Sequence, residues 1–433
     1  MDAEASVTID VTERSRESIP DGAAIDGSTT DVLDWRSSRI RHVVIVAEEN
    51  HSFDTYFGRY CTAPTGSNPA CNDGPACCEA APDHEPSGAA PTTLTDQENG
   101  DYDPDHSFDC ELSEIHGGAM DRFAAGASCS DPRNFAIADN ALMTTYHGYA
   151  QMGALADRYF QPLIGSTSAN DMYFAVTHFV FRDNDLKPDA VGQGCLDPRS
   201  STRQFTGETT LGDVLINAGW TFGYYHEGYA RMRASSTCPS PPSDCRSSLW
   251  PLSPCNYDCS DNPFQYYRQF TDNLAYMHDV DEFMTDLSAG RLPNVTFVKF
   301  STYHNEHPGF GTYISDGVQH VDRVIQAVLA SPYAEDTLIL FTMDEGGGFF
   351  DHVSPPPTST VDNEPYGTRI PAIAIGRFAR RNYVSHVVME HSSIVRFVEW
   401  NFTGTTGQLH GRDDVVNSIA SLLDPAEVGV AVP

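Results

Sequence analysis

The chain has 433 residues with 60 acidic and 26 basic side chains, which gives a formal net charge of −34. An apolar fraction of 40% is enough for a sizeable core and excludes a wholly disordered chain. The negative charge argues against nucleic acid or an anionic membrane surface as a partner, because both would repel it. Only Lys187 and Lys299 are lysines. A lysine-poor, acidic surface suits high salt, and a biased genome explains it equally well.

The first 38 residues form a polar leader without the apolar segment of a signal peptide, so the signal of an exported protein is expected to have been removed. Residues 41–47 then form a short apolar, β-branched run that predicts a buried strand. We expect one domain over residues 39–433, with irregular insertions at about 61–135 and 228–262 that are rich in Cys and Pro.

Eleven cysteines lie between residues 61 and 259, and none forms a CxxC pair. This distribution favours disulfides that hold the insertions in an oxidising compartment over a zinc site. We therefore expect a secreted or periplasmic protein whose disulfides lie in a cap over the site and outside the sheet. The odd count leaves at least one thiol unpaired within the monomer.

The remaining elements alternate between strands and helices. The sequence predicts helices over 136–160, 316–331 and 392–401, and strands over 294–300, 337–342 and 370–375. This alternation predicts an α/β fold with a largely parallel sheet covered by helices. Polar residues with metal-ligand chemistry follow several of these strands, at the edge where ligands bind in open α/β sheets.

Two of these polar clusters contain carboxylates. Glu49 and Asn50 follow the first strand, and Asp344 and Glu345 follow the strand over 337–342. Carboxylate and amide oxygens are hard ligands for a divalent metal ion. Taken alone, Glu49 and Asn50 could belong to the N-cap region of a helix, and Asp344 and Glu345 could form a solvated acidic turn.

Histidines also gather near the predicted strand ends. His304 and His307 follow the strand over 294–300, His352 follows Asp351, and His106 lies in the first insertion. Each imidazole could bind metal, hold a phosphate oxygen or protonate a leaving group, although a single histidine is more often a structural residue. Asp351 could orient His352.

A small, hydroxyl-rich turn lies at residues 165–170, with the sequence GSTSAN. A Ser or Thr hydroxyl on such a turn can be a nucleophile when a metal ion lowers its pKa. The alternative is an ordinary helix N-cap.

Taken together, these motifs resemble a bacterial phosphoesterase family that contains phospholipases C and related acid phosphatases. Residues 46–58, VAEENHSFDTYFG, resemble its E-N-x-S-F-D-x-Y-F-G signature, and residues 305–308, NEHP, resemble its S-E-H-P segment. Residues 330–353 resemble its A-S-P-x-W-x-x-T and T-x-D-E-x-G-G-x-x-D-H-V blocks, and residues 165–170 resemble its G-P-T-x-P-N segment.

The resemblance implies an alkaline-phosphatase-like fold with the site at one edge of the sheet. It implies that one divalent ion (Ca, Mg, Mn or Zn) is held by Glu49, Asn50, Asp344 and Glu345. It implies Thr167 as a nucleophile that is transiently phosphorylated. It places the following residues around the substrate: His106, His304, His307, His352, Asn170 and Asp351.

Two departures from the family pattern bear on the substrate. Asn170 is followed by Asp171, where the family usually has arginine. The resembling haemolytic phospholipases also carry C-terminal β-domains, for which this sequence leaves no room after its last matching block. We therefore expect soluble or dispersed phosphoesters as substrates, without stable membrane insertion.

The predicted function is metal-dependent hydrolysis of phosphate esters through a phosphothreonine. One alternative is a phospholipase C-type phosphodiesterase that releases a phosphocholine-like head group, which Trp220, Tyr224 and Tyr225 could enclose unless they belong to the core. An alternative of another class is a non-catalytic, calcium-stabilised extracellular binding protein. The expected partner is a small phosphoester or a phospholipid head group, and the oligomeric state is left open.

Overall fold

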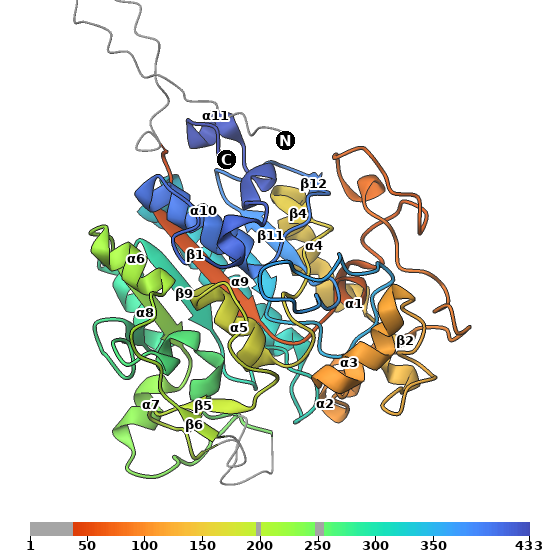
Figure 1. The fold of residues 1–433 in the computed structure, drawn as a ribbon, viewed down its shortest axis with the longest axis horizontal. Helices are drawn as coiled ribbons and strands as arrows, with labels where there is room; N and C mark the ends of the chain where they lie inside the picture. Colours follow the sequence, from red (N-terminus) through yellow and green to blue (C-terminus); the bar gives the residue numbers. More distant parts are fainter. Residues whose placement is uncertain (1–37, 196–200, 247–254) are drawn as a thin grey trace, which may run out of the picture.

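An eight-stranded sheet organises the chain, as the computed structural model shows for residues 38–195, 201–246 and 255–433 (Figure 1). The expected leader lies outside the described residues, apart from Ser38. In spatial order the strands are β12 (Tyr383–Ser385), β4 (Ala154–Ala156), β11 (Ala372–Ile375), β10 (Thr337–Met343), β1 (His42–Glu48), β9 (Val295–Lys299), β7 (Phe222–His226) and β8 (Met277–His278). Two short pairs lie outside this sheet: β2 (Thr92–Leu94) with β3 (Ala136–Ala138), and β5 (Leu186–Pro188) with β6 (Ser201–Arg203).

The central strands are parallel and almost completely buried. β1 lies between β9 and β10, and nearly all side chains of these three strands are buried on both faces. Continuous apolar runs of this kind are typical of parallel sheets that have helices on both sides. The predicted α/β fold with a largely parallel sheet is confirmed.

Helices cover both faces of the sheet. α4 (Asn140–Met152), α8 (Val280–Ser288) and α9 (Ile314–Leu329) pack on one face, and α5 (Thr167–Ala175), α6 (Leu211–Asn217) and α10 (His391–Thr403) pack on the other (Figure 1). The remaining α-helices are α1 (Phe53–Phe57), α2 (Asp96–Asp101), α3 (Phe108–Ile115), α7 (Tyr229–Ala234) and α11 (Pro425–Val428). No helix of the described residues is long and apolar enough to cross a membrane.

One local expectation differs from the structure, and one strand of the sheet runs antiparallel to its neighbours. Residues 136–160 do not form one helix, because the short strands β3 and β4 flank α4. At the end of α4, a Cβ on Gly153 would lie 2.1 Å from the carbonyl oxygen of Ala374, so only glycine allows this close approach of helix and sheet. β11 runs antiparallel to β10. A parallel strand would require a crossover to the opposite edge, which the segment between β10 and β11 does not make.

The two insertions lie on different flanks of the sheet. Figure 1 shows α2, α3 and β2 of the first insertion on one side, and α7 of the second beside β5 and β6. Ten of the eleven cysteines are paired outside the eight-stranded sheet, and Cys259 is a buried free thiol. The pairs are Cys61–Cys78, Cys71–Cys77, Cys110–Cys129, Cys195–Cys238 and Cys245–Cys255. The expected disulfides are confirmed.

This pairing predicts the number of titratable thiols. In denaturant without reductant, we expect one reactive thiol per chain, because only Cys259 is unpaired. Titration with a chromogenic disulfide reagent measures it, and prior reduction should raise the count to eleven. A count of eight or more without reductant would contradict an oxidised, exported state.

Candidate active site

The ends of β1 and β10 bring two polar clusters together. The two strands are parallel neighbours, with Glu48 beside Met343 in the register. The amide of Asp344 donates a 3.0 Å hydrogen bond to the carbonyl oxygen of Glu48. Glu49 and Asn50 therefore follow β1 at the same edge of the sheet at which Asp344 follows β10.

The glycines after Glu345 let the β10 loop approach the β1 loop. Asn50 has a left-handed backbone conformation with φ of 74°, and Gly347 has φ of 65°. A Cβ on Gly347 would lie 2.1 Å from the carbonyl oxygen of Asn50. Glycine is therefore required here, because it combines positive φ with the absence of a side chain.

Thr167 is the first residue of α5 and faces this cluster. Its hydroxyl donates a 3.5 Å hydrogen bond to Asn50 Oδ1 and lies near enough to the Asp344 carboxylate to lower the pKa of that group. Its exposed fraction is 4%. Ser166 occupies the N-cap position but makes no capping hydrogen bond, so the turn is not an ordinary N-cap.

Two buried side chains fix the turn that carries Thr167. Glu111 accepts hydrogen bonds from the amides of Gly165 at 2.8 Å and Gly348 at 3.3 Å, and so ties the turn to the β10 loop. Asn170 accepts from the Leu163 amide and donates to the carbonyl of Gly165. These bonds give Asn170 a positioning role, which differs from the expected contact with substrate.

Lys299, at the end of β9, lies within the candidate site, and the sequence did not reveal this. Its Nζ lies 2.9 Å from Glu49 Oε1, 3.3 Å from Asp344 Oδ2 and 3.5 Å from Asp171 Oδ2, and its side chain is fully buried. The scarcity of lysine was the only feature of the sequence that could have drawn attention to Lys299. Its strand has the apolar pattern of a core strand, and nothing in that pattern indicated that the lysine side chain reaches the loops after β1 and β10.

The cluster carries more negative charge than its surroundings neutralise. Burial raises the pKa of Glu345 well above its usual range, and the neighbouring Asp344 and Glu111 carboxylates raise it further. Burial also raises the pKa of Asp344, against the opposing effect of the Lys299 ammonium. Buried carboxylates in contact have this behaviour when a counter-charge is missing.

The donor set suits a hard divalent cation. Glu49, Asp344 and Glu345 supply carboxylate oxygens, Asn50 an amide oxygen and Thr167 a hydroxyl. Glu345 Oε1 is buried without a hydrogen-bond partner, as is expected of a carboxylate oxygen whose partner is a bound cation. The structure places Thr167 beside Asn50, links Glu49 and Asp344 through Lys299, and links Glu345 and Asn50 through His106.

His106 and His307 lie beside these residues. Their rings are 5.9 Å apart between centroids, and His106 Nε2 lies 3.4 Å from Asn50 Nδ2 and 3.7 Å from Glu345 Oε1. Burial lowers the pKa of His106, but the Asp103 carboxylate and other nearby acceptors raise it above its ordinary value. A protonated imidazole at the edge of the cluster can bind a phosphate oxygen or donate a proton.

His304 lies in a separate hollow beyond the end of β9. Its Nδ1 is 2.8 Å from Glu227 Oε1, and its ring stacks on His320 at 3.9 Å. These residues line a cavity of about 480 Å³ together with Arg231 and Arg323. No hydrogen bond between described residues connects His304 to Thr167, so its expected role in the leaving-group step stays a prediction.

His352 belongs to a buried ion-pair network. Its Nδ1 lies 2.7 Å from Asp54 Oδ2 and its Nε2 lies 3.3 Å from Glu79 Oε2. Arg369 pairs with Asp54 at 3.1 Å and with Asp351 at 2.7 Å. Both nitrogens of His352 are therefore engaged, and Asp351 neutralises Arg369 where we expected it to orient His352 or contact substrate. This geometry favours a structural role for both residues.

The network predicts a pH-dependent loss of stability in His352→Gln. Its carboxylates raise the pKa of His352 from 6.5 to about 9 despite burial. The stabilisation is therefore complete below pH 6.5 and disappears as the pH rises through 9. We expect His352→Gln to lower the free energy of unfolding by about 2–3 kcal/mol at pH 6. Denaturant unfolding of both proteins at pH 6 and pH 10 measures this, and an equal loss at both pH values would contradict it.

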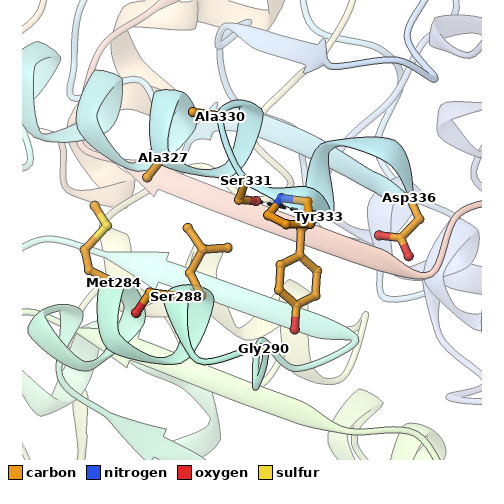
Figure 2. A pocket seen from close by; sticks show the side chains of 10 residues that line it. Met284, Ser288, Gly290, Ala327, Ala330, Ser331, Tyr333 and Asp336 are labelled. Carbon is orange, nitrogen blue, oxygen red and sulfur yellow. Dashed lines mark hydrogen bonds between the residues drawn. The ribbon is translucent and has the colours of Figure 1, made fainter.

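A different hollow lies at the opposite edge of the sheet. Figure 2 shows side chains that line a pocket between α8 and α9, with Met284 and Ser288 on one side and Ala327 on the other. Its volume is about 600 Å³. It also contains Asp336, which precedes β10, so it faces the amino ends of the strands. It contains none of the predicted site residues.

The sequence matches the Phosphoesterase family over residues 40–403, and the chain therefore belongs to this family. It is 25% identical to the hemolytic phospholipase C of Pseudomonas aeruginosa, over 84% of this chain and 53% of that protein. It is 23% identical to phospholipase C B of Mycobacterium tuberculosis, over 84% of this chain and 73% of that protein. It is 24% identical to the non-specific phospholipase C3 of Arabidopsis thaliana, over 83% of this chain and 68% of that protein.

The chain spans about half the length of the Pseudomonas relative. Among solved structures, it is similar to an alkaline phosphatase superfamily protein from Vibrio parahaemolyticus, with a TM-score of 0.41 and 10% identity over 89% of this chain and 72% of that one. It is also similar to the phosphonate monoester hydrolase of Agrobacterium radiobacter, with a TM-score of 0.38 and 10% identity over 88% of this chain and 77% of that one. The family match confirms the resemblance seen in the sequence motifs.

Proposed function

We propose that the protein is a secreted or periplasmic, metal-dependent phosphoester hydrolase that works through a phosphothreonine. The observation that supports this most strongly is Thr167, a hydroxyl at a helix N-terminus that contacts Asn50 and Asp344 within a cluster of buried carboxylates. Family membership supports the reaction class, and the disulfides support an oxidising compartment.

The reaction has two steps, the transfer of the phosphoryl group to Thr167 and the hydrolysis of the resulting phosphothreonine. Thr167 Oγ1 attacks phosphorus in line with the ester oxygen, and its proton passes to the Asp344 carboxylate. The bond to the ester oxygen breaks, and His106 donates a proton to the departing alcohol. Water then attacks phosphorus and gives a proton to His106, the bond between phosphorus and Thr167 Oγ1 breaks, Asp344 returns the proton to Thr167, and inorganic phosphate leaves. A divalent cation held by Glu49, Asn50, Asp344 and Glu345 would supply charge that acidifies the hydroxyl and stabilises the phosphoryl oxygens.

A phosphodiesterase of phospholipase C type is the second candidate, because several relatives carry that name. The three aromatic residues considered for a choline cage form hydrogen bonds with other parts of the chain. Trp220 donates to the Phe402 carbonyl, and Tyr225 donates to the Asp286 carboxylate. Tyr224 donates to the carbonyl of Asp261. A quaternary ammonium pocket would therefore have to be built from other residues.

Hydrolysis of p-nitrophenyl phosphate and of p-nitrophenyl phosphorylcholine tests the proposal and separates the two substrate classes. We expect turnover of at least one ester, its loss in EDTA and its recovery with added Mn²⁺, Mg²⁺, Ca²⁺ or Zn²⁺. A calcium-stabilised binding protein would show no turnover, and EDTA would only lower its melting temperature. That result would overturn the proposal.

A further inference from the structure

Lys299 places a positive charge inside the carboxylate cluster. Its ammonium is fully buried and lies within 3.5 Å of Glu49, Asp171 and Asp344, which come from three different segments. Glu49 Oε1 and Asp171 Oδ2 are buried oxygens without a hydrogen-bond partner, so the ammonium is the cation that each of them faces. Three carboxylates from different segments therefore surround one buried cation, and carboxylate oxygens are the ligands that hard divalent ions prefer.

The charges of the cluster explain why an ammonium suits this position. With all four carboxylates ionised, as ligands of a bound ion would be, Glu49, Asp171, Asp344 and Glu345 contribute −4, Lys299 contributes +1, and the sum is −3. One bound divalent ion brings the net charge of the cluster to −1. Without the ammonium, the net charge would be −2 with one bound divalent ion and zero with two. Buried charge that remains unpaired is costly, so the loss of the ammonium favours the entry of a second ion.

We propose that Lys299 occupies a second cation site of the cluster, between Glu49, Asp171 and Asp344, and thereby restricts the protein to one divalent ion. This inference rests on the proposed function, because it assumes an ion at Glu49, Asn50, Asp344 and Glu345. Lys299 is a positioning residue in this arrangement. It holds Glu49 and Asp344 in place and blocks the space that a second ion would need.

The test is the number of Mn²⁺ ions bound by each variant. Apoprotein is equilibrated with Mn²⁺ at high salt, which screens the acidic surface, and is separated from free metal before elemental analysis. We expect one ion per chain in the wild type and two in Lys299→Ala, which removes both the charge and the volume. Two ions about 4 Å apart are spin-coupled, so the six-line EPR signal of isolated Mn²⁺ should weaken in this variant.

Two controls separate the second site from adventitious binding. Lys299→Met removes the charge but fills the space, and it should bind one ion. Lys299→Ala combined with Asp171→Asn removes a ligand of the opened site, and it should also return to one uncoupled ion. Two ions in either control would assign the extra ion to the acidic surface and overturn the inference.

The outcomes distinguish this inference from the proposed function. One ion in both the wild type and Lys299→Ala would overturn the second site and leave the proposed function intact. No ion in the wild type would contradict the proposed metal dependence itself. If Lys299→Ala and Lys299→Ser unfold without metal, refolding with Mn²⁺ should recover both with two ions each, and failure of this rescue would overturn the inference.

Discussion

Replacing Thr167 by alanine is expected to lower kcat for p-nitrophenyl phosphate by about three to five orders of magnitude. Its hydroxyl is the group that contacts both Asn50 and Asp344, and alanine leaves no oxygen to attack phosphorus. Thr167→Ser should keep part of the activity because it retains the attacking oxygen. Steady-state kinetics measures the loss. Mass spectrometry of acid-quenched enzyme should locate one phosphoryl group on the peptide that contains Thr167.

The neighbouring serines provide matched controls. The hydroxyl of Ser166 donates to the carbonyl of His106 at 3.4 Å, and Ser168 is completely buried. Neither hydroxyl has the contacts of Thr167, so Ser166→Ala and Ser168→Ala should change kcat much less. Melting temperature and bound metal should remain similar in all of these variants. An active Thr167→Ala together with an inactive Ser166→Ala would show that the nucleophile is the adjacent residue.

Removing cation ligands is expected to abolish metal binding and activity together. Glu345→Gln preserves the shape of the side chain but removes the charge of a buried carboxylate, one oxygen of which has no hydrogen-bond partner. We expect its affinity for Mn²⁺ to fall by about 100-fold or more, because even the loss of residues that only support a ligand costs 10–100-fold. Isothermal titration calorimetry measures the affinity, and the assay with p-nitrophenyl phosphate measures the activity.

Glu48 supplies a matched control for this prediction. It is the last residue of β1, directly before Glu49, and is equally buried. Consecutive side chains of an extended segment point to opposite faces, so Glu48 is expected to point away from the cluster. Glu48→Gln should therefore leave the affinity for Mn²⁺ nearly unchanged. Stoichiometric metal in a Glu49→Ala, Asp344→Ala double variant would contradict the assigned ligand set.

The sequence alone determined the central strands and predicted the position of the candidate site. The apolar runs that became β1, β9 and β10 are long enough to specify buried parallel strands, and polar residues that follow such strands must meet at one edge. The predicted convergence of Glu49 and Asn50 with Asp344 and Glu345 depended only on this rule and on the family motifs. Strands β4 and β12 are three residues each and carry no such pattern. Their existence depends on pairing with neighbours that are distant in the sequence.

Only the tertiary structure decided the roles of single polar residues. Asp351 and His352 looked like a catalytic pair, but Arg369, Asp54 and Glu79 engage them in a buried ion-pair network. Lys299 looked like an ordinary residue of a core strand, yet it is the cation of the candidate site. The physical reason is the same in each case. Local sequence determines the strand or loop on which a side chain lies. The charge state and the function of that side chain depend on the charged groups that other segments of the chain place within a few ångströms of it.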